Sequence, residues 1–173
     1  ATAYSQTGHH DKATALLEDI QRIKGGDSAI STQLAISLLQ SHHIESGIEG
    51  LKNTYTSDAT QTQAGFALVM ALLKRKRSQE ALIYARKLYD SNPNNSSYLN
   101  LLAAAQQQIG DSVGAKSSLT SLIKIEPKSI AAHINLAKLE QRSGNASAAR
   151  QSLSSLLDEN PDNASALTAL AIL

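Results

Sequence analysis

Two pairs of adjacent histidines are the residues best suited to metal chemistry in this 173-residue sequence. They are His9-His10 and His42-His43, and imidazole nitrogens are common ligands of zinc and nickel. A metal site also needs polar groups that orient each imidazole, and the sequence identifies none beside either pair. We expect two surface turns that happen to contain histidine. Whether the two pairs together bind a metal stays open.

The sequence lacks the local signatures of enzymes. It has no GxxxxGK[ST] phosphate loop, no GxSxG nucleophile motif and no HExxH metal motif. Serine is abundant, but no Ser-His-Asp grouping stands out from the rest of the chain. Because the chain has no cysteine, disulfides and Cys-based zinc frameworks are excluded. We predict a non-enzymatic protein without a cofactor.

Charge is balanced, with 16 basic and 15 acidic residues and a net charge of +1. This balance argues against a nucleic-acid-binding protein, which would show a basic excess. The densest charge run is Lys74-Arg75-Lys76-Arg77. Cations at the end of a helix complement its dipole, so a solvated turn is the simpler interpretation. A patch for an anionic polymer or a membrane surface is the alternative. No apolar run approaches the ~18 residues that cross a bilayer.

The three prolines are evenly spaced and indicate how the chain is organised. Pro93, Pro127 and Pro161 follow one another at intervals of 34 residues. A helix-stopping residue that recurs in this way indicates a repeat array. With Pro93 at position 32 of a unit, the full repeats are 28–61, 62–95, 96–129 and 130–163. Partial repeats 1–27 and 164–173 flank them, and the whole of 1–173 is predicted to be one array.

Small and aliphatic residues recur in the same frame. Small side chains let two antiparallel helices approach closely, and aliphatic ones fill the space around the contact. Since one helix pair cannot bury its apolar face alone, stacked pairs must form the core. The columns are Ala1, Ala35, Val69, Ala103, Ala137 and Ala171 at position 8; Ala13, Gly47, Ala81, Ala115 and Ala149 at position 20; Leu17, Leu51, Ala85, Leu119 and Leu153 at position 24; and Ile20, Thr54, Leu88, Leu122 and Leu156 at position 27.

A breaker separates two helical stretches within each unit. Gly110 and Gly144 supply a left-handed residue after the first stretch, and the proline step ends the second stretch. Repeat 28–61 has His42-His43 in place of the glycine breaker and Ala59 in place of the proline. We therefore expect this repeat to have the least regular turns.

At positions 8, 20, 24, 27 and 32 the chain resembles the tetratricopeptide repeat (TPR) family over essentially its whole length. The resemblance implies an all-α fold, a TPR-type α-solenoid of stacked antiparallel helix pairs in a right-handed superhelix. Two features depart from the family: its position-4 tryptophan is missing, and position 11 keeps tyrosine only at Tyr4. His133 stands at position 4 of its repeat, where we expect a hydrogen-bonded packing residue.

The resemblance also implies a groove, lined by the first helices, that binds a protein or peptide. The residues predicted to face the partner are Gln33, Ile36, Gln40, Phe66, Met70, Lys74, Asn100, Gln107, Asn135, Lys138 and Arg142, and Thr32 and Leu101 occupy groove positions of the same type. This surface would be apolar near Phe66 and Met70 and basic toward Lys138 and Arg142. It suits a peptide with an apolar end and an acidic end. Alternatively, Phe66 and Met70 only pad neighbouring helices.

A second, narrower resemblance is based on the alanine-rich composition of three segments. Runs at 100–105, 135–140 and 160–170 resemble the TPR-repeat lipoproteins of bacterial PEP-CTERM systems, which are associated with exopolysaccharide loci. This resemblance implies an exported, lipid-anchored parent protein in the periplasm or at the outer membrane, with a cytoplasmic location as the alternative. Both chain ends fall inside a first helix, which suggests a fragment of a longer array.

The last stretch, 164–173, is apolar on most sides, so we expect end-to-end self-association through it. The predicted function is therefore a protein-interaction scaffold. A structural or self-assembly segment and an envelope protein that contacts anionic polysaccharide are the alternatives.

Overall fold

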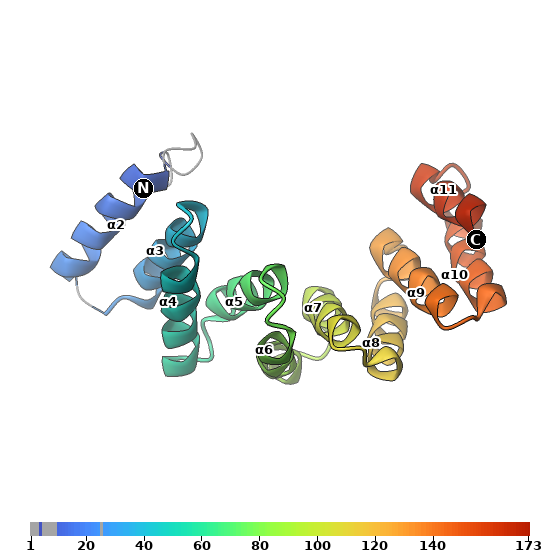
Figure 1. Ribbon diagram of the computed structural model, residues 1–173, viewed down its shortest axis with the longest axis horizontal. Helices are drawn as coiled ribbons and strands as arrows, with labels where there is room; N and C mark the ends of the chain where they lie inside the picture. Colours follow the sequence, from blue (N-terminus) through green and yellow to red (C-terminus); the bar gives the residue numbers. More distant parts are fainter. Residues whose placement is uncertain (1–3, 5–9, 25) are drawn as a thin grey trace. The chain divides into compact units, whose positions relative to one another are not determined.

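The structure is a computed structural model of the chain and describes residue 4, residues 10–24 and residues 26–173. In this part of the chain all regular secondary structure is helical, as predicted, and Figure 1 shows the helices in chain order. They are α2 (His10–Lys24), α3 (Ser28–Gln40), α4 (Ile44–Ser57), α5 (Thr62–Lys74), α6 (Ser78–Ser91), α7 (Ser96–Gln108), α8 (Ser112–Ile125), α9 (Ile130–Arg142), α10 (Ala146–Glu159) and α11 (Ala164–Ile172).

The helix bounds follow the predicted 34-residue frame. The first helices of the four full repeats (α3, α5, α7 and α9) all begin at position 1 and end at position 13. The second helices (α4, α6, α8 and α10) all begin at position 17 and end at position 30. The repeat therefore sets the secondary structure as well as the composition.

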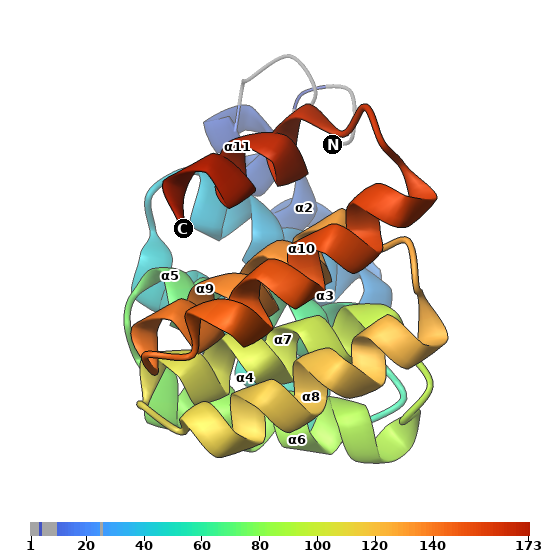
Figure 2. The same cartoon turned by 90° about the vertical axis from the view of Figure 1, so that its right-hand side faces the viewer.

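The helices fall into two compact units, Ala1–Leu88 and Tyr89–Leu173. In the first unit, neighbouring helices pack in the order α2, α3, α4 and α5, and α3 also contacts α5. In the second unit, α7 packs on α8, α8 on α9 and α9 on α10. Figure 2 shows the ribbons of α7 and α8, and of α9 and α10, running alongside each other. Helix α11 contacts both α9 and α10.

The turn inside each helix pair has one backbone conformation in all four repeats. Position 15 is left-handed throughout, with φ of 65° at His42, 58° at Lys76, 83° at Gly110 and 80° at Gly144. In each turn the next amide donates to the carbonyl five residues earlier, at 2.8 or 2.9 Å. The prediction that repeat 28–61 has the least regular turns is wrong. A histidine there adopts the conformation that glycine adopts more easily.

The turn after α4 has no proline, and hydrogen bonds to the side chain of Asp58 hold it instead. The Gln61 amide donates to the Asp58 carbonyl oxygen at 3.1 Å, and equivalent bonds close the three turns that contain proline. The Asp58 carboxylate accepts hydrogen bonds from the Thr60 hydroxyl at 2.6 Å and the Thr60 amide at 2.9 Å. These bonds, first that of the Thr60 hydroxyl, lower the pKa of Asp58. An Asx-type side-chain bond thus holds the same turn without proline.

The predicted columns form the core. Of the column residues that the structure describes, all are buried except Ile20, which is half-buried, and Ala171, which is exposed. In the first unit a β-carbon added to Gly47 would lie 2.7 Å from the Leu39 side chain, so α3 and α4 are in close contact there. A β-carbon on Gly65 would lie 2.7 Å from the Tyr55 ring, which is 3% exposed. Tyr55 therefore fills the space beside position 4 of α5.

The core of the second unit is built from three neighbouring clusters. Ala103, Ala115, Leu119 and Leu139 join α7, α8 and α9, and Leu99, Leu122 and Ala132 continue the same contact. A third cluster joins α9 and α10 to α11, and its members are Ala137, Ala149 and Leu153 with Ile134, Ala169, Leu170 and Leu173 packed against them. Part of the apolar stretch 164–173 is therefore used inside this unit.

Candidate partner-binding surface

In the first unit the predicted groove residues lie on the accessible sides of α3 and α5. Phe66 and Met70 are 36% and 51% exposed. Gln33, Gln40 and Lys74 are exposed, and Ile36 is half-buried. Phe66, Met70 and Lys74 follow one another at intervals of four residues, so they share one face of α5. The unit therefore presents two large apolar side chains with one cation at the end of the row.

In the second unit the predicted residues lie on α7 and α9. Asn100, Lys138 and Arg142 are exposed, whereas Gln107 and Asn135 are half-buried. Lys138 and Arg142 are one helical turn apart and stand on the same side of α9. This surface is polar and basic.

Two residues at groove positions do not reach the surface. Thr32 is 2% exposed, and its hydroxyl donates to the Ser28 carbonyl at 2.8 Å. Leu101 is 3% exposed and belongs to the core. The groove frame taken from the family therefore gives too wide a set of contact positions in α3 and α7. The accessible part of the predicted groove therefore excludes Thr32 and Leu101 and consists of the other predicted side chains.

The four first helices carry almost no acid. Helices α3 and α7 contain no charged residue, α5 contains only Lys74, and α9 contains Lys138, Glu140 and Arg142. Glu140 is 4% exposed, so it does not contribute to the surface. The carboxylates on the helices of these repeats lie otherwise on second helices such as α4, α6 and α10. Carboxylates of these repeats therefore lie mainly on the second helices, whereas basic side chains occur on both kinds of helix.

The buried carboxylate of Glu140 has two polar partners. The Lys116 ammonium lies 2.5 Å from one of its oxygens, and the Asn145 side-chain amide donates to the other at 2.9 Å. The Lys116 hydrogen bond lowers the pKa of Glu140 most, although burial acts in the opposite direction. The same position holds Leu38 and Leu72 in the first unit. Glu140 thus connects α9 to α8 by a charged contact at a position that is otherwise apolar or neutral.

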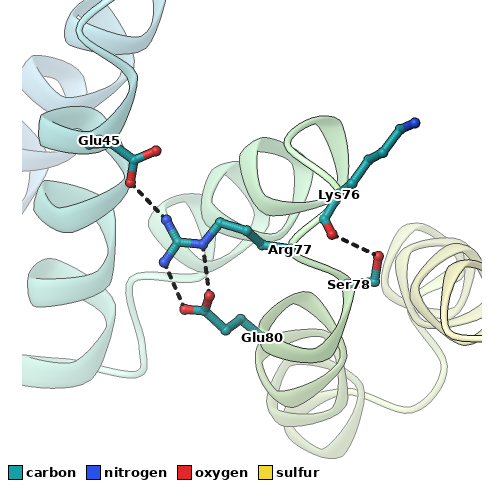
Figure 3. A network of polar contacts seen from close by, with 5 residues as sticks. All are labelled: Glu45, Lys76, Arg77, Ser78 and Glu80. Carbon is teal, nitrogen blue, oxygen red and sulfur yellow. Dashed lines mark hydrogen bonds and ion pairs between the residues drawn. The ribbon is translucent and has the colours of Figure 1, made fainter.

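The basic run 74–77 is not a uniform patch. Arg77 forms ion pairs with Glu80, at 2.7 Å from its Nε, and with Glu45, at 2.9 Å from its Nη1 (Figure 3). The hydrogen bond with Glu80 raises the pKa of Arg77 and lowers that of Glu80. Figure 3 shows the Lys76 side chain pointing away from this network. Arg77 therefore links α4 to the first turn of α6 through its two ion pairs. No sequence signal indicated this role, because Glu45 is 32 residues away.

The histidines have separate roles. His133 is 4% exposed, and its Nδ1 and Nε2 lie 2.8 Å from the Ser152 carbonyl oxygen and 2.9 Å from the Pro127 carbonyl oxygen. The prediction of a hydrogen-bonded packing residue is confirmed. His42 and His43 are exposed in the α3–α4 turn. His9 and the side chain of His10 lie outside the described residues. Within the described part of the chain, no cluster of three or more His, Asp or Glu side chains is placed to hold a metal ion.

The geometry and the family comparison define the class of protein. Residues 108–173 match the tetratricopeptide repeat family. Together with the helix pairs in a common 34-residue register and the solved structures below, this match shows that the chain has an all-α TPR-type fold. TPR proteins are typically scaffolds for protein–protein interaction and are generally non-enzymatic. None of the described helices combines the length and apolarity needed to span a membrane.

Solved structures with the same fold cover nearly the whole chain. MamA 41-end from Desulfovibrio magneticus RS-1 is 16% identical with a TM-score of 0.84, over 94% of this chain and 93% of that one. Another structure of MamA is 17% identical with a TM-score of 0.83, over 94% and 95%. YrrB, described as a TPR protein with an unusual peptide-binding site, is 15% identical with a TM-score of 0.79, over 97% and 87%. At these identities the likeness shows the fold alone. No curated protein matches the chain.

Proposed function

We propose that this protein is a non-enzymatic scaffold that binds a peptide or partner protein along the accessible sides of its first helices. The observation that carries the proposal is the row of Phe66 and Met70, two large apolar side chains that α5 leaves 36% and 51% exposed. Soluble proteins seldom leave neighbouring large apolar side chains in water without an interaction to make. YrrB, a TPR protein with an unusual peptide-binding site, shares the fold, and peptide recognition is consistent with this use of it.

Each unit also presents basic side chains on its own first helices. Lys74 follows Phe66 and Met70 on α5 in the first unit, and Lys138 and Arg142 lie on α9 in the second, with no accessible carboxylate on either helix. A partner with apolar anchors and acidic residues complements these side chains. We propose the other predicted residues as further contacts around these anchors, apolar at Ile36 and polar at Gln33, Gln40, Asn100, Gln107 and Asn135.

Peptides selected from a displayed random library against the intact chain would test this proposal. Each selected peptide is then titrated by fluorescence polarisation against three variants. The double variant Phe66→Ala/Met70→Ala should weaken binding by about tenfold or more, because buried aromatic and apolar anchors dominate such contacts. Ile83→Ala is the matched control, since Ile83 is 55% exposed on the second helix α6. Lys138→Glu/Arg142→Glu tests the basic end. Peptides that bind all variants equally would refute the proposed surface.

A structural role in self-assembly is the second candidate, and α11 carries it. Leu167 and Ile172 are 47% and 72% exposed on this helix, although Leu170 and Leu173 pack inside the second unit. A second copy would cover these side chains in end-to-end association. Sedimentation velocity over a hundredfold concentration range should then show a dimer that Leu167→Ser/Ile172→Ser removes. A monomer at every concentration contradicts this candidate.

An envelope role in contact with anionic polysaccharide is a third context. It depends on the likeness to PEP-CTERM lipoproteins, which the comparisons do not support. Arg77 is engaged with Glu45 and Glu80, so the contact would depend on the exposed Arg75 and Lys76 together with Lys74. Alginate binding that survives Lys74→Glu/Lys76→Glu would exclude the run from such a role.

A further inference from the structure

Helix α2 carries an apolar stripe that is partly open. Leu16, Ile20 and Ile23 follow one another at intervals of four and three residues, so they share one face of the helix. Leu16 and Ile23 are 38% and 83% exposed, and Ile20 is half-buried. Leu16 and Ile20 stand at positions 23 and 27 of the repeat. In the four full repeats no residue at position 23 is exposed, and every residue at position 27 is buried. The face that the other second helices cover is therefore accessible on α2.

Contacts within the full repeats show what covers this face. Leu99, at position 4 of the first helix α7, packs with Leu122 at position 27 of α8. His133, at position 4 of α9, places its Nδ1 2.8 Å from the carbonyl oxygen of Ser152 at position 23 of α10. The face is thus covered by the N-terminal part of the first helix of the same repeat.

Helix α11 presents the complementary half of such a contact. It contacts α10 and α9, as α5 contacts α4 and α3, so it is placed as a first helix. Leu167 at its position 4 is 47% exposed, whereas Leu99 and His133 at the same position are 1% and 4% exposed. Ala171 at position 8 is also exposed, although its described equivalents in the four full repeats are buried. The side of α11 that would face a second helix is therefore open.

The two open faces match in chemistry as well as in register. Helix α11 has no charged residue, and Asp19 and Arg22 beside the stripe on α2 pair with each other at 3.2 Å. An uncharged apolar helix can therefore cover the stripe and leave this ion pair intact. Ala13 and Leu17, nearer the start of α2, are buried. The open length of α2 thus corresponds to the N-terminal part of a first helix, which 164–170 supplies.

We infer that α11 of one copy packs against α2 of a second copy as a first helix packs against a second, with Leu167 between Leu16 and Ile20. The inference rests on the self-assembly candidate proposed above and names the surface that accepts α11. The two faces differ, so the contact is heterologous and can extend from copy to copy. Because few side chains are buried at each junction, association should be weak and dependent on concentration.

Complementation between two variants tests this contact. Leu16→Ser introduces the residue that Ser118 and Ser152 already provide at position 23, so α2 should still fold, and Leu167→Ser alters α11 alone. In sedimentation velocity from about 10 µM to about 1 mM, the parent chain should associate, and each variant alone should associate about tenfold more weakly or less. An equal mixture should form heterodimers and nothing larger, because it retains one intact α11 and one intact α2 for each pair.

Ile83→Ser is the matched control, since Ile83 is 55% exposed on α6, and it should associate like the parent. Thermal melting followed by circular dichroism checks that all the variants fold.

Crosslinking locates the contact. The chain has no cysteine, so Leu16→Cys and Leu167→Cys each introduce a single thiol. With one of the two chains isotope-labelled, intact masses distinguish the mixed dimer from the two homodimers. A short bis-maleimide should form the mixed dimer about tenfold faster than either homodimer. Ile83→Cys in place of Leu16→Cys gives the rate that random collision produces.

Each contrary result has a distinct meaning. Leu16→Ser chains that associate as strongly as the parent would show a symmetric contact between two α11 helices, which overturns the inference and retains the self-assembly candidate. A mixture of the serine variants that stays monomeric, or crosslinking no faster than with Ile83→Cys, overturns the contact with α2. A parent chain that is monomeric at every concentration overturns the inference and the self-assembly candidate together.

Discussion

A single left-handed residue closes each helix pair, and four different local sequences supply it. Gly110 and Gly144 adopt φ near 80° with open space around them, whereas His42 and Lys76 adopt φ of 65° and 58° with a β-carbon in place. The left-handed conformation costs a non-glycine residue ~1–2 kcal/mol. The two repeats of the first unit therefore store strain in a turn that the second unit forms without it.

This difference gives a paired prediction. Lys76→Gly should raise the free energy of unfolding by about 0.5–1 kcal/mol, because relief of the strain exceeds the added entropy of the unfolded chain. Gly110→Ala should lower it by about 1 kcal/mol for the converse reason. Urea denaturation monitored by circular dichroism measures both. Changes of the same sign for the two variants would contradict the shared turn.

A second prediction concerns His133. His133→Leu should cost ~1–3 kcal/mol of stability, because it removes the ring nitrogens from beside the carbonyls of Ser152 and Pro127. Leucine is the matched choice, since Leu99 is 1% exposed at the same position of the preceding repeat. A variant that unfolds like the parent in thermal scans would show that these hydrogen bonds are not needed.

At the scale of the helix, the joint between α8 and α9 depends on the ionised form of Glu140. The pKa of Glu140 is lowered by Lys116 from the ordinary value of 4.5. A carboxyl whose pKa is lower in the folded state stabilises the fold above its unfolded pKa. That contribution is lost as the pH falls from about 4.5 through the lowered folded value.

The expected outcome follows from the sequence of the other repeats. Leu38 and Leu72 occupy the position of Glu140 in the first unit, so Glu140→Leu should fold. The melting temperature of the parent should fall more steeply than that of the variant below about pH 4.5. Parallel melting curves of the two proteins from pH 7 to pH 3 would contradict the role given to this carboxylate.

Most of the helical framework could be predicted from the sequence, since proline spacing and small-residue columns are local, repeated signals. The helix bounds and the buried Ala103, Leu119 and Leu153 follow from them. The contacts of Arg77 with Glu45 and of Glu140 with Lys116 could not be predicted, because in each pair the partner lies on another helix at a distance that no repeat rule fixes. The burial of Thr32 and Leu101 was missed because a family frame assigns positions to a groove without regard to local packing.

At the scale of the whole molecule, a net charge near zero conceals the lack of accessible carboxylates on the first helices of the four full repeats. Because the accessible charges of the first helices are Lys74, Lys138 and Arg142, association with an acidic partner should weaken as salt rises from about 50 to about 500 mM. Stopped-flow association rates measured on selected peptides would check this, and Lys138→Gln/Arg142→Gln should flatten the dependence. A rate independent of salt would show that the cations do not guide binding.

The invariant turn has a consequence for how such chains are detected. The residues matched by the family, 108–173, include Gly110, Gly144, Pro127 and Pro161. In the earlier turns, which contain His42, Lys76 and Asp58, the same backbone hydrogen bonds form without glycine or proline at these positions. The two earlier full repeats of this chain thus keep the turn geometry without the glycine of the later repeats, so the backbone conformation is less tied to particular residues than the family match is.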